Sequence, residues 1–113
     1  MNHQIRTGVI GVGNIGQHHA RIYASLPGSQ LVGVADTHPD RAQDIAERYE
    51  VPAYADFHDL LDQVEAVSVA APTTLHHEIG LACLARGVHV LIEKPLAASV
   101  EQGHELATAA SQA

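Results

Sequence analysis

The sequence has no tryptophan, one phenylalanine and one cysteine among its 113 residues. The single thiol, Cys83, cannot form a disulfide within the chain, which excludes a disulfide-rich secreted scaffold and favours a reducing compartment. The first residues, Met1 to Gln4, lack the charged and then apolar pattern of a signal peptide, and no apolar run approaches the length of a membrane span. We therefore expect a cytoplasmic protein with no membrane partner.

Basic residues are also scarce. Six lysines and arginines stand against 13 acidic residues, the formal net charge is −7, and the basic residues do not cluster. This balance argues against a nucleic-acid partner, because such partners need a concentrated basic surface. The length leaves room for one hydrophobic core, so we expect a single domain over residues 1–113.

The nine histidines do not have the spacing of a metal site. The adjacent pairs His18-His19 and His76-His77 point to different faces of a helix, and no H-x-x-x-H, H-E-x-x-H or C-x-x-C pattern occurs. No metal is expected. His19 is interpreted as a core histidine, whereas His76 is expected either to contact a ligand or to cap a turn locally.

What the sequence does contain is an alternation of short apolar runs and amphipathic stretches. We expect strands near residues 5–10, 31–35, 51–54, 66–70 and 88–92, each followed by a helix. This alternation predicts the α/β class, with a doubly wound parallel sheet of the Rossmann type. The first helix is expected to bury a stripe made of Ile15, His19, Ile22 and Leu26 against the sheet.

The turn from the first strand into the first helix carries the spacing G-x-G-x-x-G. Gly11 permits the tight turn, Gly13 lets the backbone approach a pyrophosphate, and Gly16 lets the helix lie close to the sheet. The amide groups and the dipole of the helix N-terminus then favour phosphate. We interpret the turn as a dinucleotide site; the alternative is a turn with a purely structural role.

Asp36 ends the second apolar run about 20 residues after the last glycine of this motif. Its carboxylate could accept hydrogen bonds from the hydroxyls of an adenosine ribose, and its charge would repel a 2′-phosphate, which favours NAD over NADP. The alternative role is that of a helix cap. Arg41 leaves NADP open, since it could neutralise a phosphate or lie against the adenine ring.

In a parallel sheet of this type, ligands bind outside the carboxyl ends of the strands. The segments 71–73 and 93–95 are expected at that edge, together with Gly11 and Asp36. Pro95 restricts the backbone of Lys94 to an extended direction. Near a nicotinamide, this lysine could help to remove the proton of a substrate hydroxyl as hydride leaves the carbon. The alternative is an ordinary exposed lysine.

Taken together, the segments G-V-G-N-I-G-x-x-H-A, V-A-D, A-x-P-T-x-x-H and G-V-H-V-L-I-E-K-P-L-A resemble the glucose–fructose oxidoreductase and inositol dehydrogenase (Gfo/Idh/MocA) family. The resemblance covers nearly the whole chain and is greatest to members that oxidise nucleotide sugars. It implies an NAD-dependent dehydrogenase of sugars, nucleotide sugars or polyols. The site residues it implies are Gly11, Gly13, Asn14, Ile15 and Gly16 at the pyrophosphate; Asp36 at the adenosine ribose; Ala71, Pro72, Thr73 and His76 along the cofactor path; and Glu93 and Lys94 at the nicotinamide ribose, with Lys94 also at the substrate hydroxyl.

The sequence departs from this family in its length, because family members continue into a sixth strand and a second α/β domain that carries the substrate pocket. We therefore expect this chain to bind the dinucleotide with little or no turnover, since positioning of the substrate supplies much of catalysis. The strand at 88–92 would leave an unpaired edge, which favours a homo-oligomer. The alternative function is a stand-alone NAD(H)-binding sensor or regulatory module.

Overall fold

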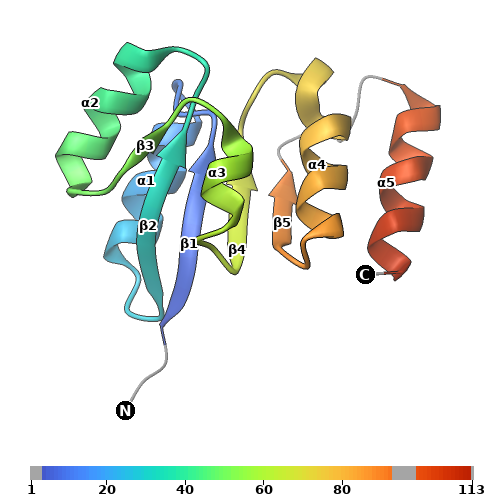
Figure 1. Ribbon diagram of the computed structural model, residues 1–113, viewed down its shortest axis with the longest axis horizontal. Helices are drawn as coiled ribbons and strands as arrows, with labels where there is room; N and C mark the ends of the chain where they lie inside the picture. The colour runs from blue at the N-terminus through green and yellow to red at the C-terminus, as the bar shows by residue number, and fades with distance from the viewer. Residues whose placement is uncertain (1–3, 93–98, 113) are drawn as a thin grey trace.

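The computed structural model describes residues 4–92 and 99–112, in which strands and helices alternate along the chain (Figure 1). The strands are β1 (Ile5–Ile10), β2 (Ser29–Ala35), β3 (Ala53–Tyr54), β4 (Ala66–Val69) and β5 (His89–Ile92). The helices are α1 (Gly16–Ser25), α2 (Pro39–Tyr49), α3 (Phe57–Leu61), α4 (His76–Ala85) and α5 (Val100–Gln112), with a 3₁₀ turn, η1 (Thr73–Leu75), directly before α4.

The described strands form one parallel sheet in the order β3-β2-β1-β4-β5. The chain moves outward from β1 to β3 and then crosses back to place β4 on the other side of β1. This order confirms the doubly wound Rossmann-type sheet expected from the sequence. It also creates a topological switch point between β1 and β4. The connection after β1 leads to β2 on one side and the connection after β4 leads to β5 on the other, which leaves a crevice between them.

The strands end level with one another. Ile10, the last residue of β1, lies opposite Ala35 of β2 and Val69 of β4. In the same way Ala35 pairs with Tyr54, and Val69 pairs with Ile92. The segments that follow β1, β2, β3 and β4 therefore meet at one edge of the sheet, as predicted; the segment that follows β5 lies outside the described residues.

Two layers of helices cover the sheet. Helices α1 and α2 pack on one face, over a core that includes Val9, Val34 and Ile45. Helices α3 and α4 pack on the other face, over a core that includes Leu60 and Val67, and α5 lies beside α4 (Figure 1). Burial of these apolar side chains on both faces accounts for the continuous apolar character of the strand sequences.

The predicted buried stripe of α1 is wrong by one position. Ile15, Ile22 and Leu26 are 57%, 43% and 47% exposed, whereas Gly16 and Ala20 are buried. Small residues face the sheet because the start of α1 lies almost in contact with the loop after β1, so the larger side chains one position away point outward. His19 of the predicted stripe is half-buried, and its Nδ1 shares a 3.0 Å hydrogen bond with the hydroxyl of Ser68, which gives it a structural partner.

Several predicted helix ends are confirmed. The carboxylate of Asp56 accepts a 2.9 Å hydrogen bond from the amide of His58 and caps α3. Gly87, with φ of +72°, follows the end of α4, and the amide of Gln102 donates to the hydroxyl of Ser99 at the start of α5. Among the described helices, none has the length and apolar character that crossing a bilayer would require.

Candidate functional site

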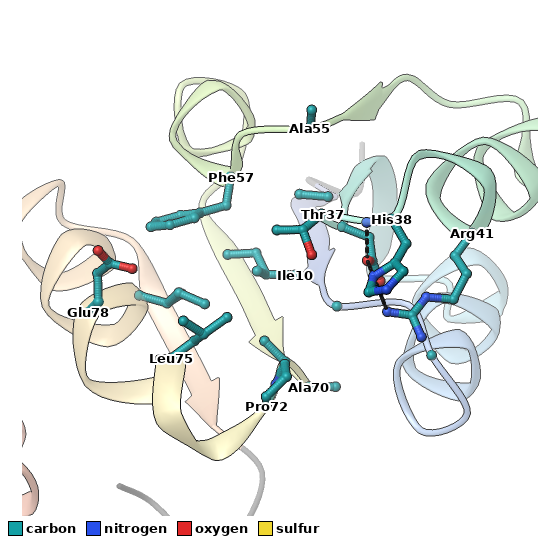
Figure 2. A pocket seen from close by; sticks show the side chains of 16 residues that line it. Ile10, Thr37, His38, Arg41, Ala55, Phe57, Ala70, Pro72, Leu75 and Glu78 are labelled. Carbon is teal, nitrogen blue, oxygen red and sulfur yellow. Dashed lines mark hydrogen bonds and ion pairs between the residues drawn. The ribbon is translucent and has the colours of Figure 1, made fainter. Parts of the chain in front are cut away.

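A cavity of about 460 Å³ lies at the carboxyl edge of the sheet, over the switch point (Figure 2). It is lined by the loop after β1, the segment from β2 into α2, the start of α3, and the segment from β4 into α4. This is the size of pocket that binds small molecules and cofactors, and its place is where parallel α/β sheets bind them. Within the described part of the chain, no group of three His, Cys, Asp or Glu side chains is placed to hold a metal ion.

The loop after β1 is built around two glycines. Gly11 has φ of +90°, and a Cβ there would lie 2.6 Å from the amide nitrogen of Ala71. A Cβ on Gly16 would lie 1.7 Å from the carbonyl oxygen of Gly11, so α1 can begin here only without a side chain. The helix N-terminus carries no side-chain cap and no acidic residue in its first turn. Its amide groups and dipole therefore suit an anion such as pyrophosphate.

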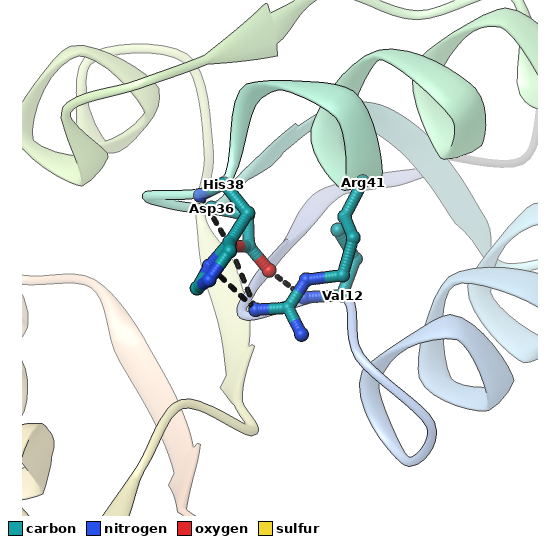
Figure 3. Close-up of polar contacts among 4 residues, drawn as sticks. All are labelled: Val12, Asp36, His38 and Arg41. Atoms are coloured by element: carbon teal, nitrogen blue, oxygen red, sulfur yellow. Dashed lines mark hydrogen bonds and ion pairs between the residues drawn. The ribbon is translucent and has the colours of Figure 1, made fainter.

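Asp36 connects this loop to the end of β2 (Figure 3). Its Oδ2 accepts a 2.9 Å hydrogen bond from the amide of Val12, and its Oδ1 accepts one of 2.8 Å from the amide of His38. The guanidinium of Arg41 donates to the same Oδ1 at 3.1 Å. The Asp36 side chain is 3% exposed, so the carboxylate is enclosed by its own donors.

The charge of Asp36 is maintained by these donors. Burial alone would raise the pKa of the carboxyl, because desolvation disfavours the anion. The two backbone hydrogen bonds, from His38 and Val12, together with the hydrogen bond and charge of Arg41, outweigh burial and hold the pKa below its usual value. The carboxylate is therefore ionised at neutral pH and can accept hydrogen bonds from sugar hydroxyls.

Arg41 reaches across the mouth of the site. Besides Asp36, its Nη2 contacts Nδ1 of His38 at 2.9 Å, and its Nη1 lies 3.5 Å from the position that a Cβ on Gly13 would occupy. A positive charge thus lies over the glycine loop, next to the carboxylate. Asp36, which favours NAD, and Arg41, which leaves NADP open, therefore belong to one hydrogen-bonded group.

The cavity brings together six of the residues expected at the site: Gly11, Gly13, Asp36, Arg41, Ala71 and Pro72. Four others lie beside it without lining it: Asn14 and Ile15 are exposed just before α1, Gly16 is buried beneath the loop, and Thr73 is half-buried in η1. Glu93 and Lys94, expected at the nicotinamide end, lie outside the described residues.

His76 has a defined structural position behind the cavity. It is 1% exposed, and its Nε2 donates a 2.8 Å hydrogen bond to the carbonyl of Ala71. The side chain thereby fixes the backbone of the segment after β4, whose residues Ala71 and Pro72 line the cavity.

The far end of the cavity is lined by residues that were not predicted from the sequence. Ala55 and Phe57 enter it after β3, and Leu75, Glu78 and Ile79 enter it from η1 and α4. The signal that could have found the last three is their spacing, since residues three and four apart share a helix face. That face follows directly on the Pro72–Thr73 turn that was expected at the same edge.

Comparisons with known proteins identify the family of the chain. The family model described as "Oxidoreductase family, NAD-binding Rossmann fold" (GFO_IDH_MocA) matches residues 5–113. A UDP-N-acetylglucosamine 3-dehydrogenase of Acidithiobacillus ferrooxidans is 41% identical over 102 residues, which are 90% of this chain and 32% of that protein. An inositol 2-dehydrogenase of Rubrobacter xylanophilus is 39% identical over 109 residues, which are 94% of this chain and 31% of that protein.

Solved structures extend the comparison to the fold. A structure of the Acidithiobacillus ferrooxidans dehydrogenase superposes with a TM-score of 0.92 at 39% identity, over 96% of this chain and 36% of that one. GenD2 from gentamicin A biosynthesis, solved in complex with NAD, gives a TM-score of 0.92 at 31% identity, over 97% of this chain and 32% of that one. The chain thus spans about a third of the length of the relatives it matches.

Proposed function

We propose, from the premise that the chain belongs to the Gfo/Idh/MocA oxidoreductase family, that residues 1–113 form the cofactor-binding domain of an NAD-dependent dehydrogenase. Its substrate is proposed to be the hydroxyl of a sugar, nucleotide sugar or polyol. This proposal rests on one observation: the glycine loop and the ionised Asp36 are joined by a hydrogen bond and line the same cavity. NAD, when bound, supplies the acceptor for a hydride from the carbon that bears the hydroxyl.

The proposed contacts follow the order of the dinucleotide. Gly11, Gly13, Asn14, Ile15 and Gly16 bind the pyrophosphate through backbone amides at the start of α1. Asp36 accepts hydrogen bonds from the adenosine ribose, in place of one or more of its present donors. Ala71, Pro72, Thr73 and His76 form the path along the end of β4, with His76 acting through the Ala71 carbonyl. Glu93 and Lys94 are proposed at the nicotinamide ribose, as the resemblance of the E-K-P segment to the family implies.

NAD is preferred over NADP in this proposal, because the Asp36 carboxylate would lie against a 2′-phosphate. The positive charge of Arg41 opposes that preference, so Asp36 and Arg41 together set the ratio of NAD affinity to NADP affinity. Lys94 is proposed as the catalytic residue, whose Nζ hydrogen-bonds the substrate hydroxyl and takes its proton as the hydride departs.

Self-association and location complete the proposal. In the described sheet, β5 is an outer strand that pairs with β4, and Leu91 on it is 57% exposed. Such an apolar edge favours pairing with a second copy, so we propose a homo-oligomer. A cytoplasmic location is proposed because the one cysteine, Cys83, is a buried free thiol.

A chimera tests the dehydrogenase function. This chain replaces the matching N-terminal part of the Acidithiobacillus ferrooxidans UDP-N-acetylglucosamine 3-dehydrogenase, and NADH formation is followed at saturating NAD with UDP-N-acetylglucosamine. We expect turnover by the chimera, a loss of at least about a hundredfold in Lys94→Ala, and little or none by the 113-residue chain alone. A folded chimera that binds NAD but oxidises nothing would instead favour a sensor or regulatory module.

A further inference from the structure

The cavity has two chemically different ends (Figure 2). Asp36, His38 and Arg41 make one end polar and charged. At the other end, Phe57 of α3 lies across from Leu75 and Glu78, which come from η1 and α4 (Figure 2). Of the described residues that line this second end, Glu78 is the one with a charge.

We infer that Glu78 accepts a hydrogen bond from the exocyclic 6-amino group of the purine base, which lies at the apolar end of the cavity when the dinucleotide is bound as proposed above. This inference rests on the proposed NAD-binding function and specifies the base that the site selects. Glu78 is thereby a specificity-determining residue, which distinguishes an adenine dinucleotide from a 6-oxopurine dinucleotide.

The position of the base follows from the position of the ribose. With the ribose hydroxyls on Asp36, the base lies one glycosidic bond further along the cavity. A flat aromatic base is stabilised between apolar and aromatic side chains, and Phe57 and Leu75, both half-buried, supply such surfaces. The buried Ile79 contributes to the apolar lining of the same end.

The chemistry of Glu78 supplies the selection. Its side chain has no hydrogen bond or ion pair with any residue in the described ranges 4–92 and 99–112, so its carboxylate is available to a ligand. An ionised carboxylate only accepts hydrogen bonds. Adenine offers an amino donor at position 6, whereas hypoxanthine offers a carbonyl acceptor there, which would face the carboxylate with no proton between them.

Titration calorimetry on the 113-residue chain tests this inference with NAD and with nicotinamide hypoxanthine dinucleotide, which differ at position 6 of the purine. We expect the wild-type chain to bind NAD about tenfold more tightly, the effect of one charge-assisted hydrogen bond. In Glu78→Gln the preference should fall to about twofold or less, because an amide can both donate and accept. AMP and IMP differ at the same position and lack the nicotinamide half. The same preference for AMP over IMP would show that the selection is made at the purine nucleotide half of the cofactor.

A matched variant controls for the loss of one negative charge. Glu101 is exposed on α5 and does not line the cavity, so Glu101→Gln should keep the full preference for NAD. Equal binding of the two dinucleotides by the wild type, or an unchanged preference in Glu78→Gln, overturns the inference and leaves NAD binding intact. Binding of neither dinucleotide overturns the proposed function together with the inference.

Discussion

The backbone amide of Val12 donates a 2.9 Å hydrogen bond to the carboxylate of Asp36, which joins the loop after β1 to the end of β2. The two residues are 24 positions apart in the sequence, and the parallel register brings their strands to the same edge. One carboxylate therefore has two roles, because it holds the glycine loop in shape and is the proposed acceptor for the ribose. Changes at Asp36 should affect stability and binding together.

Removal of this carboxylate should lower the stability of the fold. In Asp36→Ala the amides of Val12 and His38 lose their hydrogen-bond acceptor. Because the Asp36 side chain is only 3% exposed, water cannot readily replace it. We expect the free energy of unfolding to fall by about 1–3 kcal/mol, as measured by urea denaturation. Asp44→Ala is the control, because its pair with Arg48 is exposed and should contribute less than about 0.5 kcal/mol. Equal effects of the two changes would contradict the role assigned to Asp36.

The pH dependence of stability should identify the same carboxylate. Its pKa is lower in the folded chain than its ordinary value of 3.8. A depressed folded pKa contributes stability that is fully present above the unfolded pKa and is lost as pH falls through the folded pKa. The stability difference between the wild type and Asp36→Asn should thus be constant from neutral pH down to about 5 and shrink below about 4. A difference that grows on acidification would mean that the folded pKa is raised.

Much of the architecture could be predicted from the sequence, because the central strands β1, β2 and β4 are largely buried and their apolar runs are unambiguous. The glycine loop and Asp36 could be predicted for a different reason, since few residue types satisfy a turn with φ of +90° or a pair of backbone donors. The buried face of α1 could not be predicted, because helical spacing alone does not distinguish the stripe of Ile15 and Ile22 from the neighbouring stripe of Gly16 and Ala20. The close approach of α1 to the loop decides between them.

The far end of the cavity was also beyond prediction from local patterns. Phe57 and Glu78 are 21 positions apart by their numbering, on helices that meet only because α3 and α4 pack on the same face of the sheet. Nothing in the sequence around either residue indicates the other. The same limit applies to Arg41, whose contact with the glycine loop depends on the angle at which α2 leaves β2.

The close approach of Gly16 to Gly11 gives a third prediction. Gly16→Ala would place a Cβ 1.7 Å from the Gly11 carbonyl oxygen, so either α1 or the loop must move. We expect a loss of at least about 2 kcal/mol in unfolding free energy and loss of measurable NAD binding. Gly103→Ala is the control in α5, where the new Cβ would meet no atom within 4 Å other than the nearby backbone of the helix itself and its chain neighbours. This change should stabilise the helix by about 0.5–1 kcal/mol. NAD affinity that survives Gly16→Ala in a folded chain would contradict the role of the loop.

Arg41 should set the discrimination between the two cofactors. Its guanidinium lies 3.1 Å from Asp36 and is the positive group beside the proposed ribose site. In Arg41→Ala we expect NADP affinity to fall about tenfold more than NAD affinity, because a 2′-phosphate would then face the carboxylate without a counter-charge. Calorimetric titrations with both cofactors measure the ratio. Parallel loss of the two affinities would mean that Arg41 contacts a part that the cofactors share.

Calorimetric titration of the folded wild-type chain with NAD decides whether the chain binds this cofactor through the glycine loop and Asp36. We expect a saturable heat that fits one site per chain and is strongly reduced in Asp36→Ala. A folded chain that gives no saturable heat up to millimolar NAD, or an Asp36→Ala chain that binds as well as the wild type, would contradict it.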